Sequence, residues 1–464
     1  MTAVRIFALA LAIVLSCPGF RLYGSFPMPP YLQAVTRGGI CVLVEATATD
    51  TLAVVYGRTA SYGNTARTHM ILMTTGSTYV HRVWISGLAP NTLYHYRAIQ
   101  NADTSDDATF RTAPDPGTPF RFAWFADSRT GTAVHEAIAR RIAEASPVVS
   151  LYGGDIASSP SYAAWKNEFF RPDQLALIAR VPFYNAPGNH EGWATNTMAF
   201  TQTPDTASQA LGYFSVDYGD MHVLVLNTEV SFSQGSPQYA FAGNDLSSTT
   251  KQWKIVIAHK PAYCAGGHGE NTDLKLMTQA IFELRSVDMV IGGHSHFYQH
   301  NLVKGIHHMV LGSAGAPLYD TDSASYTLKS ARDYSYGIVD VTPGTFRMMV
   351  YNAGGAVLDS IILRKPPAAK TGDLVLPREF RLYPNYPNPF NPTTTIRYDV
   401  PRSAYVNLSV FDVLGHRVSE EVDGRQEAGR YNVSVTGERL SGWVYFCRLE
   451  AAGTVLVRKL LLLR

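Results

Sequence analysis

Five short polar segments of this sequence carry side chains that are suited to holding a metal ion. In chain order they supply Asp127, Asp155, Asn189, His259 and the pair His294 and His296. Two carboxylates, one amide oxygen and three imidazoles form a mixed oxygen and nitrogen set, which suits zinc, iron or manganese better than calcium or magnesium. Cysteine is missing from the set, which argues against a structural zinc site.

Each of these residues, taken alone, also has an ordinary structural explanation. An aspartate before a helix can cap its N-terminus, a single histidine at a strand end is commonly a hydrogen-bonded surface residue, and Gly188-Asn189 is a common turn pair. The order of the five segments, and the strand-like run before each of them, favour a metal site over coincidence.

The segments that must position these side chains alternate between strand and helix patterns. Between the first two polar turns, Val134, Ile138 and Ile142 recur at helical spacing. Each candidate ligand segment directly follows an apolar run, at residues 121–126, 148–152, 181–184, 254–258 and 288–291. Functional groups of α/β domains collect in loops at the carboxyl ends of strands. We therefore expect a central α/β domain at residues 119–364.

The motifs in these turns resemble those of the calcineurin-like metallophosphoesterase superfamily, whose pattern is D-x-H, GD, GNH-D/E, H and GHxH in that order. Gly188-Asn189-His190-Glu191 and Gly293-His294-Ser295-His296 are the strongest matches. The similarity covers residues 120–341 and implies an α/β fold of two sheets flanked by helices. With the β module that precedes it, the organisation is similar to that of purple acid phosphatases and their bacterial relatives.

The resemblance implies a centre of two divalent or trivalent metal ions, of iron, zinc or manganese, bridged by Asp155. The residues implied for the first ion, here called the first-metal group, are Asp127, Asp155 and His296. The residues implied for the second ion, the second-metal group, are Asp155, Asn189, His259 and His294. Such a centre hydrolyses a phosphate ester through a metal-bound hydroxide.

Three further residues receive roles near this centre. The resemblance implies that His190 faces the substrate and assists the leaving group as an acid, with Glu191 orienting His190 or a ligand. Tyr298, directly after the GHxH turn, is expected to flank the substrate pocket.

The sequence departs from the pattern at two positions. Arg129 replaces the histidine of D-x-H, and it cannot bind a metal because it stays protonated. Ser158 stands where purple acid phosphatases carry a tyrosine, so the charge-transfer colour of those enzymes is not expected. Two interpretations of Arg129 are open: a substrate contact that binds phosphate through its planar fork, or a salt bridge to a nearby acid. Sparse ligation predicts weaker binding of the first ion, and His135 is a weak candidate for the missing ligand.

The N-terminal part predicts export and a β module. Residues 1–24 combine a basic start, a short apolar run and a Pro-Gly end, as a secretory signal peptide does. Residues 27–113 show short alternating strands, and the stretch from Gly87 to Tyr96 resembles the tyrosine corner of a fibronectin type III β-sandwich. This module is expected to act as a scaffold.

The C-terminal part predicts a second small β-sandwich. Residues 365–379 form an expected linker, and residues 380–464 resemble the C-terminal sorting domains of type IX secretion cargo. The resemblance implies the type IX machinery as a partner. We expect a secreted or cell-surface protein that passes through the periplasm.

Bulk composition leaves room for this multidomain organisation and excludes some functions. The chain has 464 residues with 46% hydrophobic and 16% charged residues, and its net charge of +2 is scattered, so no nucleic-acid surface is indicated. No apolar run reaches the ~20 residues of a membrane span. The preferred function is hydrolysis of phosphomonoesters on small molecules. Phosphodiester or nucleotide hydrolysis is the alternative, and a surface binding module with a degenerate metal site is the alternative from another class.

Overall fold

The computed structural model describes residues 26–366, 377, 379–437, 440 and 444–463. The described residues up to 366 form one compact unit, and those from 377 onward form another. The expected signal peptide, 1–24, and most of the expected linker, 365–379, lie outside the described residues. Within the described part, no helix is long and apolar enough to cross a membrane.

Ten described strands form the larger sheet of the first unit, and three parallel strands, β10, β11 and β12, lie in its interior. In spatial order the strands are β22 (Val357–Arg364), β21 (Thr345–Asn352), β20 (Ser335–Val341), β10 (Phe120–Phe125), β11 (Val149–Tyr152), β12 (Phe183–Asn185), β1 (Tyr31–Gln33), β2 (Gly39–Ala46), β6 (Tyr79–Ser86) and β5 (Met70–Met73).

Seven described strands form the second sheet of this unit, in which β14, β15, β16 and β18 are parallel neighbours. In spatial order they are β13 (Phe214–Tyr218), β14 (Met221–Val225), β15 (Trp253–Ile257), β16 (Met289–Gly292), β18 (Ile306–Leu311), β17 (Tyr298–Val303) and β19 (Thr327–Ala331).

The inner strands of the two sheets are apolar on both faces. One face of each sheet packs into a core that the two sheets share. On β14 and β15, Val223 and Ile255 belong to the core that contains the larger sheet, whereas Leu224 and Val256 belong to a separate core with the helices. Strands buried on both faces read as continuous apolar runs rather than as alternation. Burial on both faces therefore explains the unbroken apolar runs of the sequence from which the α/β domain is predicted.

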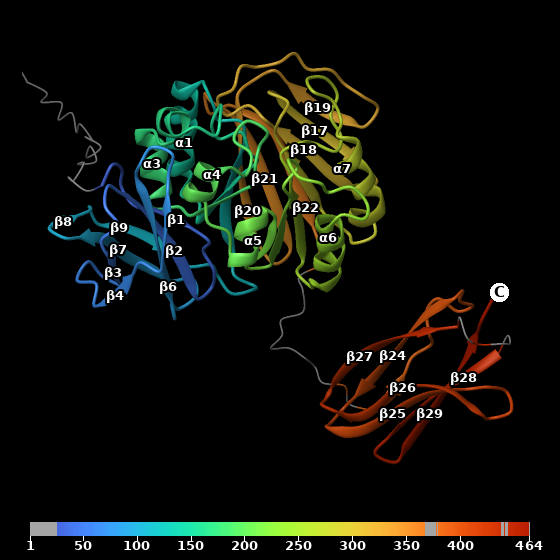
Figure 1. The fold of residues 1–464 in the computed structure, drawn as a ribbon. Helices are drawn as coiled ribbons and strands as arrows, with labels where there is room; N and C mark the ends of the chain where they lie inside the picture. The colour runs from blue at the N-terminus through green and yellow to red at the C-terminus, as the bar shows by residue number, and fades with distance from the viewer. Residues whose placement is uncertain (1–25, 367–376, 378, 438–439, 441–443, 464) are drawn as a thin grey trace, which may run out of the picture. The chain divides into compact units, whose positions relative to one another are not determined.

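Helices cover the outer faces of the two sheets (Figure 1). Those near the larger sheet include α1 (Thr132–Ala145), α2 (Tyr162–Ala164), the π-helical turn η1 (Trp165–Phe169), α3 (Pro172–Ile178) and α4 (Thr195–Phe200). The other helices are α5 (Thr206–Leu211), α6 (Pro237–Ser248), α7 (Thr272–Met277) and the π-helical turn η2 (Thr278–Phe282). α6 and α7 pack on the smaller sheet through Ala242, Leu246, Leu274 and Met277.

The N-terminal strands are joined to the central sheet, which differs from the separate sandwich expected at residues 27–113. β1 pairs in parallel with β12, through Gln33 opposite Phe183. Side chains reinforce this joint, because the Tyr31 hydroxyl donates to the Phe200 carbonyl at 2.9 Å and buried Arg82 donates to the Thr201 carbonyl at 2.8 Å. One sheet of the N-terminal module is therefore an extension of the central sheet.

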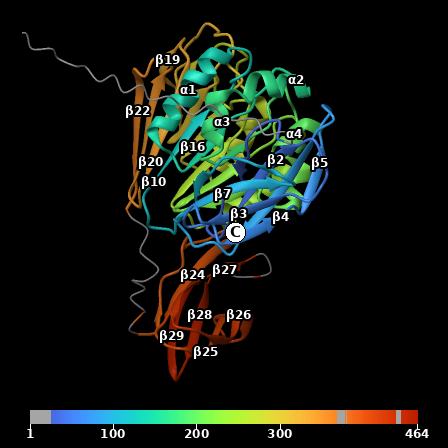
Figure 2. The same ribbon diagram turned by 90° about the vertical axis from the view of Figure 1, so that its left-hand side faces the viewer.

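The other N-terminal sheet is formed by β4 (Asn64–Arg67), β3 (Ala53–Gly57), β7 (Leu93–Gln100), β8 (Asp103–Thr104) and β9 (Ala108–Arg111). Its strands β7, β3 and β4 are labelled in Figure 2. The hydroxyl of Tyr94 on β7 accepts a hydrogen bond from the backbone N–H of Ala89 at 3.0 Å. This is the contact that a tyrosine corner makes. Membership of the fibronectin type III family stays a prediction.

The C-terminal unit consists of two antiparallel sheets around its own core. One sheet contains β23 (Arg381–Leu382), β24 (Thr393–Val400) and β27 (Gly429–Thr436). The other contains β26 (Arg417–Gln426), β25 (Ala404–Phe411), β28 (Val444–Ala451) and β29 (Thr454–Leu461). The C-terminal residues with the period-two pattern therefore fold into the β-sandwich that this pattern predicts.

Candidate metal centre

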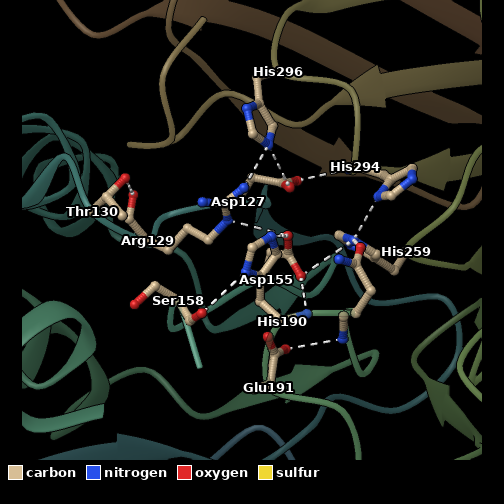
Figure 3. A network of polar contacts seen from close by, with 12 residues as sticks. Asp127, Arg129, Thr130, Asp155, Ser158, His190, Glu191, His259, His294 and His296 are labelled. Atoms are coloured by element: carbon tan, nitrogen blue, oxygen red, sulfur yellow. Dashed lines mark hydrogen bonds and ion pairs between the residues drawn. The ribbon is translucent and has the colours of Figure 1, made fainter. Parts of the chain in front are cut away.

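The five polar segments follow parallel strands of the two sheets and meet at one place (Figure 3). Asp127, Asp155 and Asn189 come after β10, β11 and β12 of the larger sheet, and His259 and His294 come after β15 and β16 of the smaller sheet. Because these strands are parallel, their carboxyl ends lie at the same edge of each sheet. The structure thus brings together side chains that are far apart in the sequence.

The backbone of the centre is held in conformations that most residues avoid. Asp127, Asp155 and His294 have positive φ angles of 55°, 52° and 68°. Such left-handed residues cost free energy and persist where the surrounding structure fixes them, often at functional sites. Gly188 and Gly293 pass so close to Asp155 and Asp127, respectively, that a Cβ atom at either glycine would overlap the aspartate.

The candidate ligand atoms of the second-metal group lie close to one another. His259 donates its Nδ1–H to the Gly153 carbonyl at 2.8 Å, which leaves Nε2 as an acceptor in the neutral ring. This Nε2 lies 3.0 Å from Asn189 Oδ1, 3.3 Å from Asp155 Oδ1 and 3.2 Å from His294 Nδ1. Burial and the neighbouring His259 lower the pKa of His294 to about 3, so this ring is neutral near pH ~7.

The distances from His259 Nε2 to the other three atoms are those expected between ligands of one cation. Ligand atoms that lie ~2.1 Å from a common ion are ~3.0–3.4 Å apart in octahedral or tetrahedral geometry, and the separations from His259 Nε2 are 3.0–3.3 Å. Neutral imidazoles, an amide oxygen and a carboxylate form a donor set suited to zinc, iron or manganese. The residues present therefore fit a metal ion at the second position.

The first-metal group also lies together and is more deeply buried. Suitable ligand atoms of Asp127, Asp155 and His296 are all within 4.8 Å of one another. His296 directs Nδ1 to the Pro317 carbonyl at 2.8 Å, and burial lowers the pKa of its imidazole to about 4, so its Nε2 is an acceptor. Burial raises the pKa of Asp127, and its Oδ1 has no hydrogen-bond partner among the described residues.

The guanidinium of Arg129 lies inside the first-metal group (Figure 3). Its Nε is 3.3 Å from Asp155 Oδ2, and its Nη2 is 3.3 Å from His296 Nε2. Of the two interpretations of Arg129, the salt bridge to an acid is therefore present, and the acid is Asp155. Two of the three acceptors of the first-metal group already face a cation, so the residues at the first position do not fit a metal ion.

His190 faces the same centre from the loop after β12. Its Nδ1 donates to the Ser158 carbonyl at 3.0 Å, and its Nε2 lies 3.7 Å from Asp155 Oδ2. With 34% of its side chain exposed, His190 is accessible to a bound molecule. The role of His190 as a proton donor stays a prediction.

Glu191, expected to orient His190 or a ligand, contacts the backbone of their turn. Its side chain is buried, and its Oε1 accepts from the backbone N–H of Gly188 at 2.9 Å. Burial raises the pKa of this carboxyl. Glu191 therefore braces the turn that carries Asn189 and His190.

Glu168, which no sequence pattern indicates, ties the loop of Arg129 to the loop of Ser158. Its Oε2 accepts from the backbone N–H groups of Thr130 at 3.2 Å and Ser158 at 2.8 Å, and its Oε1 accepts from the Ser158 hydroxyl at 2.5 Å. Glu168 lies on the π-helical turn η1, and this turn brings its carboxylate to the two loops. No motif in the sequence therefore indicates its role. Ser158 is thus occupied by Glu168, so it does not replace the missing tyrosine as a ligand.

Two aromatic rings cover the GHxH turn. His268 stacks on His294 with ring centroids 4.3 Å apart, and Tyr319 stacks on His296 at 4.1 Å. Neither residue is among the sequence-predicted site residues. The Gly-rich stretch after His259 is the available signal for His268, whereas Tyr319 has none.

Two other candidates lie away from the centre. Tyr298 is fully buried and its hydroxyl donates to Asp359 at 2.6 Å, so the expected substrate contact is corrected to a structural role. His135 is buried with its ring stacked against Phe169, and neither ring nitrogen has a partner among the described residues. It does not supply the missing ligand.

Two family models match this chain. Residues 120–298 match the calcineurin-like phosphoesterase family, and residues 385–463 match the secretion system C-terminal sorting domain. The sorting domain indicates secretion to the cell surface or the extracellular space.

Curated relatives include plant proteins with purple acid phosphatase names. The Arabidopsis thaliana protein named "Probable purple acid phosphatase 20" is 25% identical over 270 residues, covering 53% of this chain and 62% of the relative. "Probable inactive purple acid phosphatase 1" of the same organism is 23% identical over 358 residues, covering 62% of this chain and 58% of the relative. The chain thus spans about three fifths of the length of these relatives.

Solved structures agree with the fold. A purple acid phosphatase from yellow lupin (Lupinus luteus) seeds superimposes with a TM-score of 0.65 at 18% identity, covering 74% of this chain and 75% of that chain. The structure of PhoD gives a TM-score of 0.56 at 13% identity, covering 76% and 94%. At these identities the two solved structures show the fold alone. The chain therefore carries a calcineurin-like metallophosphoesterase domain, homologous to purple acid phosphatases, and a type IX secretion C-terminal sorting domain.

Proposed function

We propose that this protein is an exported, metal-dependent hydrolase of phosphate esters. The observation that carries the proposal is the cluster around the buried Asp155, whose Oδ1 faces His259 at 3.3 Å and whose Oδ2 faces Arg129 at 3.3 Å. Once an ion is bound by the second-metal group, the ion and the Arg129 guanidinium place two positive charges on either side of the Asp155 carboxylate. Such a site suits a phosphate dianion.

The residues of the second-metal group would hold the ion, which polarises a phosphate oxygen and lowers the pKa of a water molecule. Arg129 supplies a permanent charge beside Asp155 and orients the phosphate through its N–H donors. His190 keeps its Nδ1–H on the Ser158 carbonyl, so the second proton of the charged ring resides on Nε2. His190 delivers that proton to the leaving-group oxygen as the P–O bond breaks.

Phosphomonoesters of small molecules are the preferred substrates, with phosphodiesters or nucleotides as the alternative. Support comes from the purple acid phosphatase names among the relatives and from the accessible His190. The metal identity follows the donor set and is iron, zinc or manganese. The type IX machinery is the proposed partner of the C-terminal unit.

The test compares p-nitrophenyl phosphate with bis(p-nitrophenyl) phosphate as substrates of the purified full chain, with and without a chelator. We expect chelator-sensitive release of nitrophenol that is restored by zinc, manganese or iron and is faster from the monoester. Faster release from the diester would reassign the substrate class. Absence of chelator-sensitive turnover with all three metals would reject the hydrolase.

A surface binding module with a degenerate metal site is the second candidate. Arg129 within the first-metal group favours it, and so do the relatives whose names call them inactive. This candidate predicts that phosphate esters bind, as measured by calorimetry, and are recovered intact.

A further inference from the structure

We infer that Arg129 replaces one of the two metal ions of this centre, which therefore holds one ion and one guanidinium. The inference rests on the proposed function only in requiring that the second-metal group binds an ion. The inference states how many cations the centre holds and of which kind. The proposed function states that the centre hydrolyses phosphate esters.

The bridging carboxylate shows how the two cation positions are divided. Oδ1 of Asp155 lies 3.3 Å from His259 Nε2 of the second-metal group and accepts the backbone N–H of His190 at 3.0 Å, whereas Oδ2 receives Arg129 Nε at 3.3 Å. A carboxylate that bridges two metal ions uses one oxygen for each. Here the same division is made between a set of metal ligands and a guanidinium (Figure 3).

Too few free ligands remain at the first position for a metal ion. Arg129 Nη2 occupies the acceptor lone pair of His296, because the other ring nitrogen is committed to Pro317. The Ser158 hydroxyl is committed to Glu168. Asp127 Oδ1 is then left as the free acceptor of the first-metal group. Stable sites of transition metals provide three or four protein ligands.

Arg129 is fixed in place rather than free to swing away. Only 12% of its side chain is exposed, and its loop contains Asp127 and Thr130 with positive φ angles of 55° and 64°. Glu168 holds the next residue, Thr130, through its backbone N–H at 3.2 Å. An exposed arginine has many rotamers, but this one is confined by a clamped loop and two polar contacts.

A fixed guanidinium has chemical consequences that an exchangeable ion does not. It remains charged at every physiological pH and cannot be removed by a chelator. A divalent ion beside it would meet a like charge at short range, which opposes occupancy of the first position. Its remaining N–H donors, beyond those that face Asp155 and His296, can then point to a phosphate oxygen.

The test counts ions in the full chain. The parent and the variants Arg129→His and Arg129→Lys are loaded with Mn²⁺, passed through a desalting column and measured by plasma mass spectrometry. We expect one ion per chain for the parent and for Arg129→Lys, which keeps the charge. We expect two for Arg129→His, because this change removes the charge and restores the imidazole of the D-x-H pattern.

Electron paramagnetic resonance of the same samples provides an independent readout. An isolated Mn²⁺ spectrum is expected for the parent and an exchange-coupled spectrum for Arg129→His. Unchanged circular dichroism and thermal unfolding show that the variants are folded. If Arg129→His is not folded, Arg129→Gln replaces it, and a second, weaker ion is expected because the charge is lost.

The outcomes separate this inference from the proposed function. Two ions in the parent, or one ion in the folded uncharged variants as well, would overturn it, and so would a parent that binds none. One ion in the parent and two in Arg129→His, without any turnover, would support the inference while rejecting the hydrolase.

Discussion

The two halves of the metal centre use similar residues and reach different results. In the second-metal group, Asn189 Oδ1, Asp155 Oδ1 and His294 Nδ1 lie 3.0–3.3 Å from His259 Nε2, and no side-chain cation of the described residues lies among them. In the first-metal group, two of the three acceptors already receive a donor from Arg129. Oxygen and nitrogen atoms with lone pairs that crowd together in this way favour the binding of a cation. A motif therefore identifies residues that lie together, but the hydrogen-bond donors around them decide whether an ion is required.

The largest effect is expected where the two halves share a residue. Asp155→Asn removes the charge that both cations face, so we expect loss of the bound ion and a fall in kcat/KM of at least ~10³-fold. Metal analysis and steady-state kinetics measure the two effects. Asp320→Asn, at a highly exposed carboxylate, is the matched control and should behave as the parent. A fall of less than tenfold in Asp155→Asn would remove Asp155 from the mechanism.

The variants His259→Ala and His296→Ala test the difference between the second-metal group and the first-metal group most directly. His259 belongs to the group that fits an ion, so its loss should weaken metal binding by more than the ~10–100-fold that outer-shell changes cost. His296 faces Arg129, so its loss should leave the metal content unchanged and lower turnover. Competition with a fluorescent chelator measures both affinities. Equal losses of metal in the two variants would contradict the division into two unlike halves.

A smaller effect is expected at the clamp that fixes Arg129. Glu168→Ala removes three hydrogen bonds that hold the loops of Thr130 and Ser158. We expect kcat/KM to fall about tenfold, which equals ~1.4 kcal/mol of transition-state stabilisation, at unchanged metal content. Glu168→Gln can remake part of these bonds with its amide and should restore most of the activity. Equal activity in Glu168→Ala and the parent would show that Arg129 is fixed without the clamp.

The smallest effect on the metal centre, namely none, is expected for His135, which lies outside both groups and affects the stability of the fold. Burial lowers its pKa to about 3, so below pH ~6.5 the unfolded chain takes up a proton that the folded chain refuses. Stability is therefore full above pH ~6.5 and is lost as the pH falls, by up to ~1.4 kcal/mol per pH unit.

The variant His135→Phe should lose this part of the pH dependence and keep its metal content. Urea unfolding at pH ~7 and pH ~5 measures the difference, which we expect to be ~2 kcal/mol smaller in the variant than in the parent. Loss of metal from His135→Phe would instead assign His135 to the centre.

The meeting of the candidate ligands at one place could be predicted from sequence because their placement is local. Each follows a buried strand directly, and parallel strands bring their carboxyl ends together without further information. The N-terminal joint could not be predicted, since β1 has three residues and carries no pattern that names β12 as its partner. Tyr298 was misplaced because nearness in sequence to the GHxH turn says nothing about which side of β17 its ring occupies.

The environment of Arg129 could not be predicted from sequence either. The direction of the Arg129 side chain depends on Glu168, which holds the neighbouring Thr130. Glu168 lies 38 positions further along the chain, on a π-helical turn. The choice between a substrate contact and a salt bridge needed the distances to Asp155 and His296. Such contacts depend on tertiary packing, which local residue patterns do not encode.

The pairing of β1 with β12 joins the N-terminal module to the loop of the candidate metal centre. β12 leads directly into the turn that carries Asn189 and His190, and β1 covers its other edge. Deleting the N-terminal strands would leave β12 as an unpaired edge with exposed backbone donors and acceptors, a template for aggregation. The two regions must therefore unfold cooperatively, and a shortened chain that starts at the first phosphoesterase strand would lose the order of its own ligand loop.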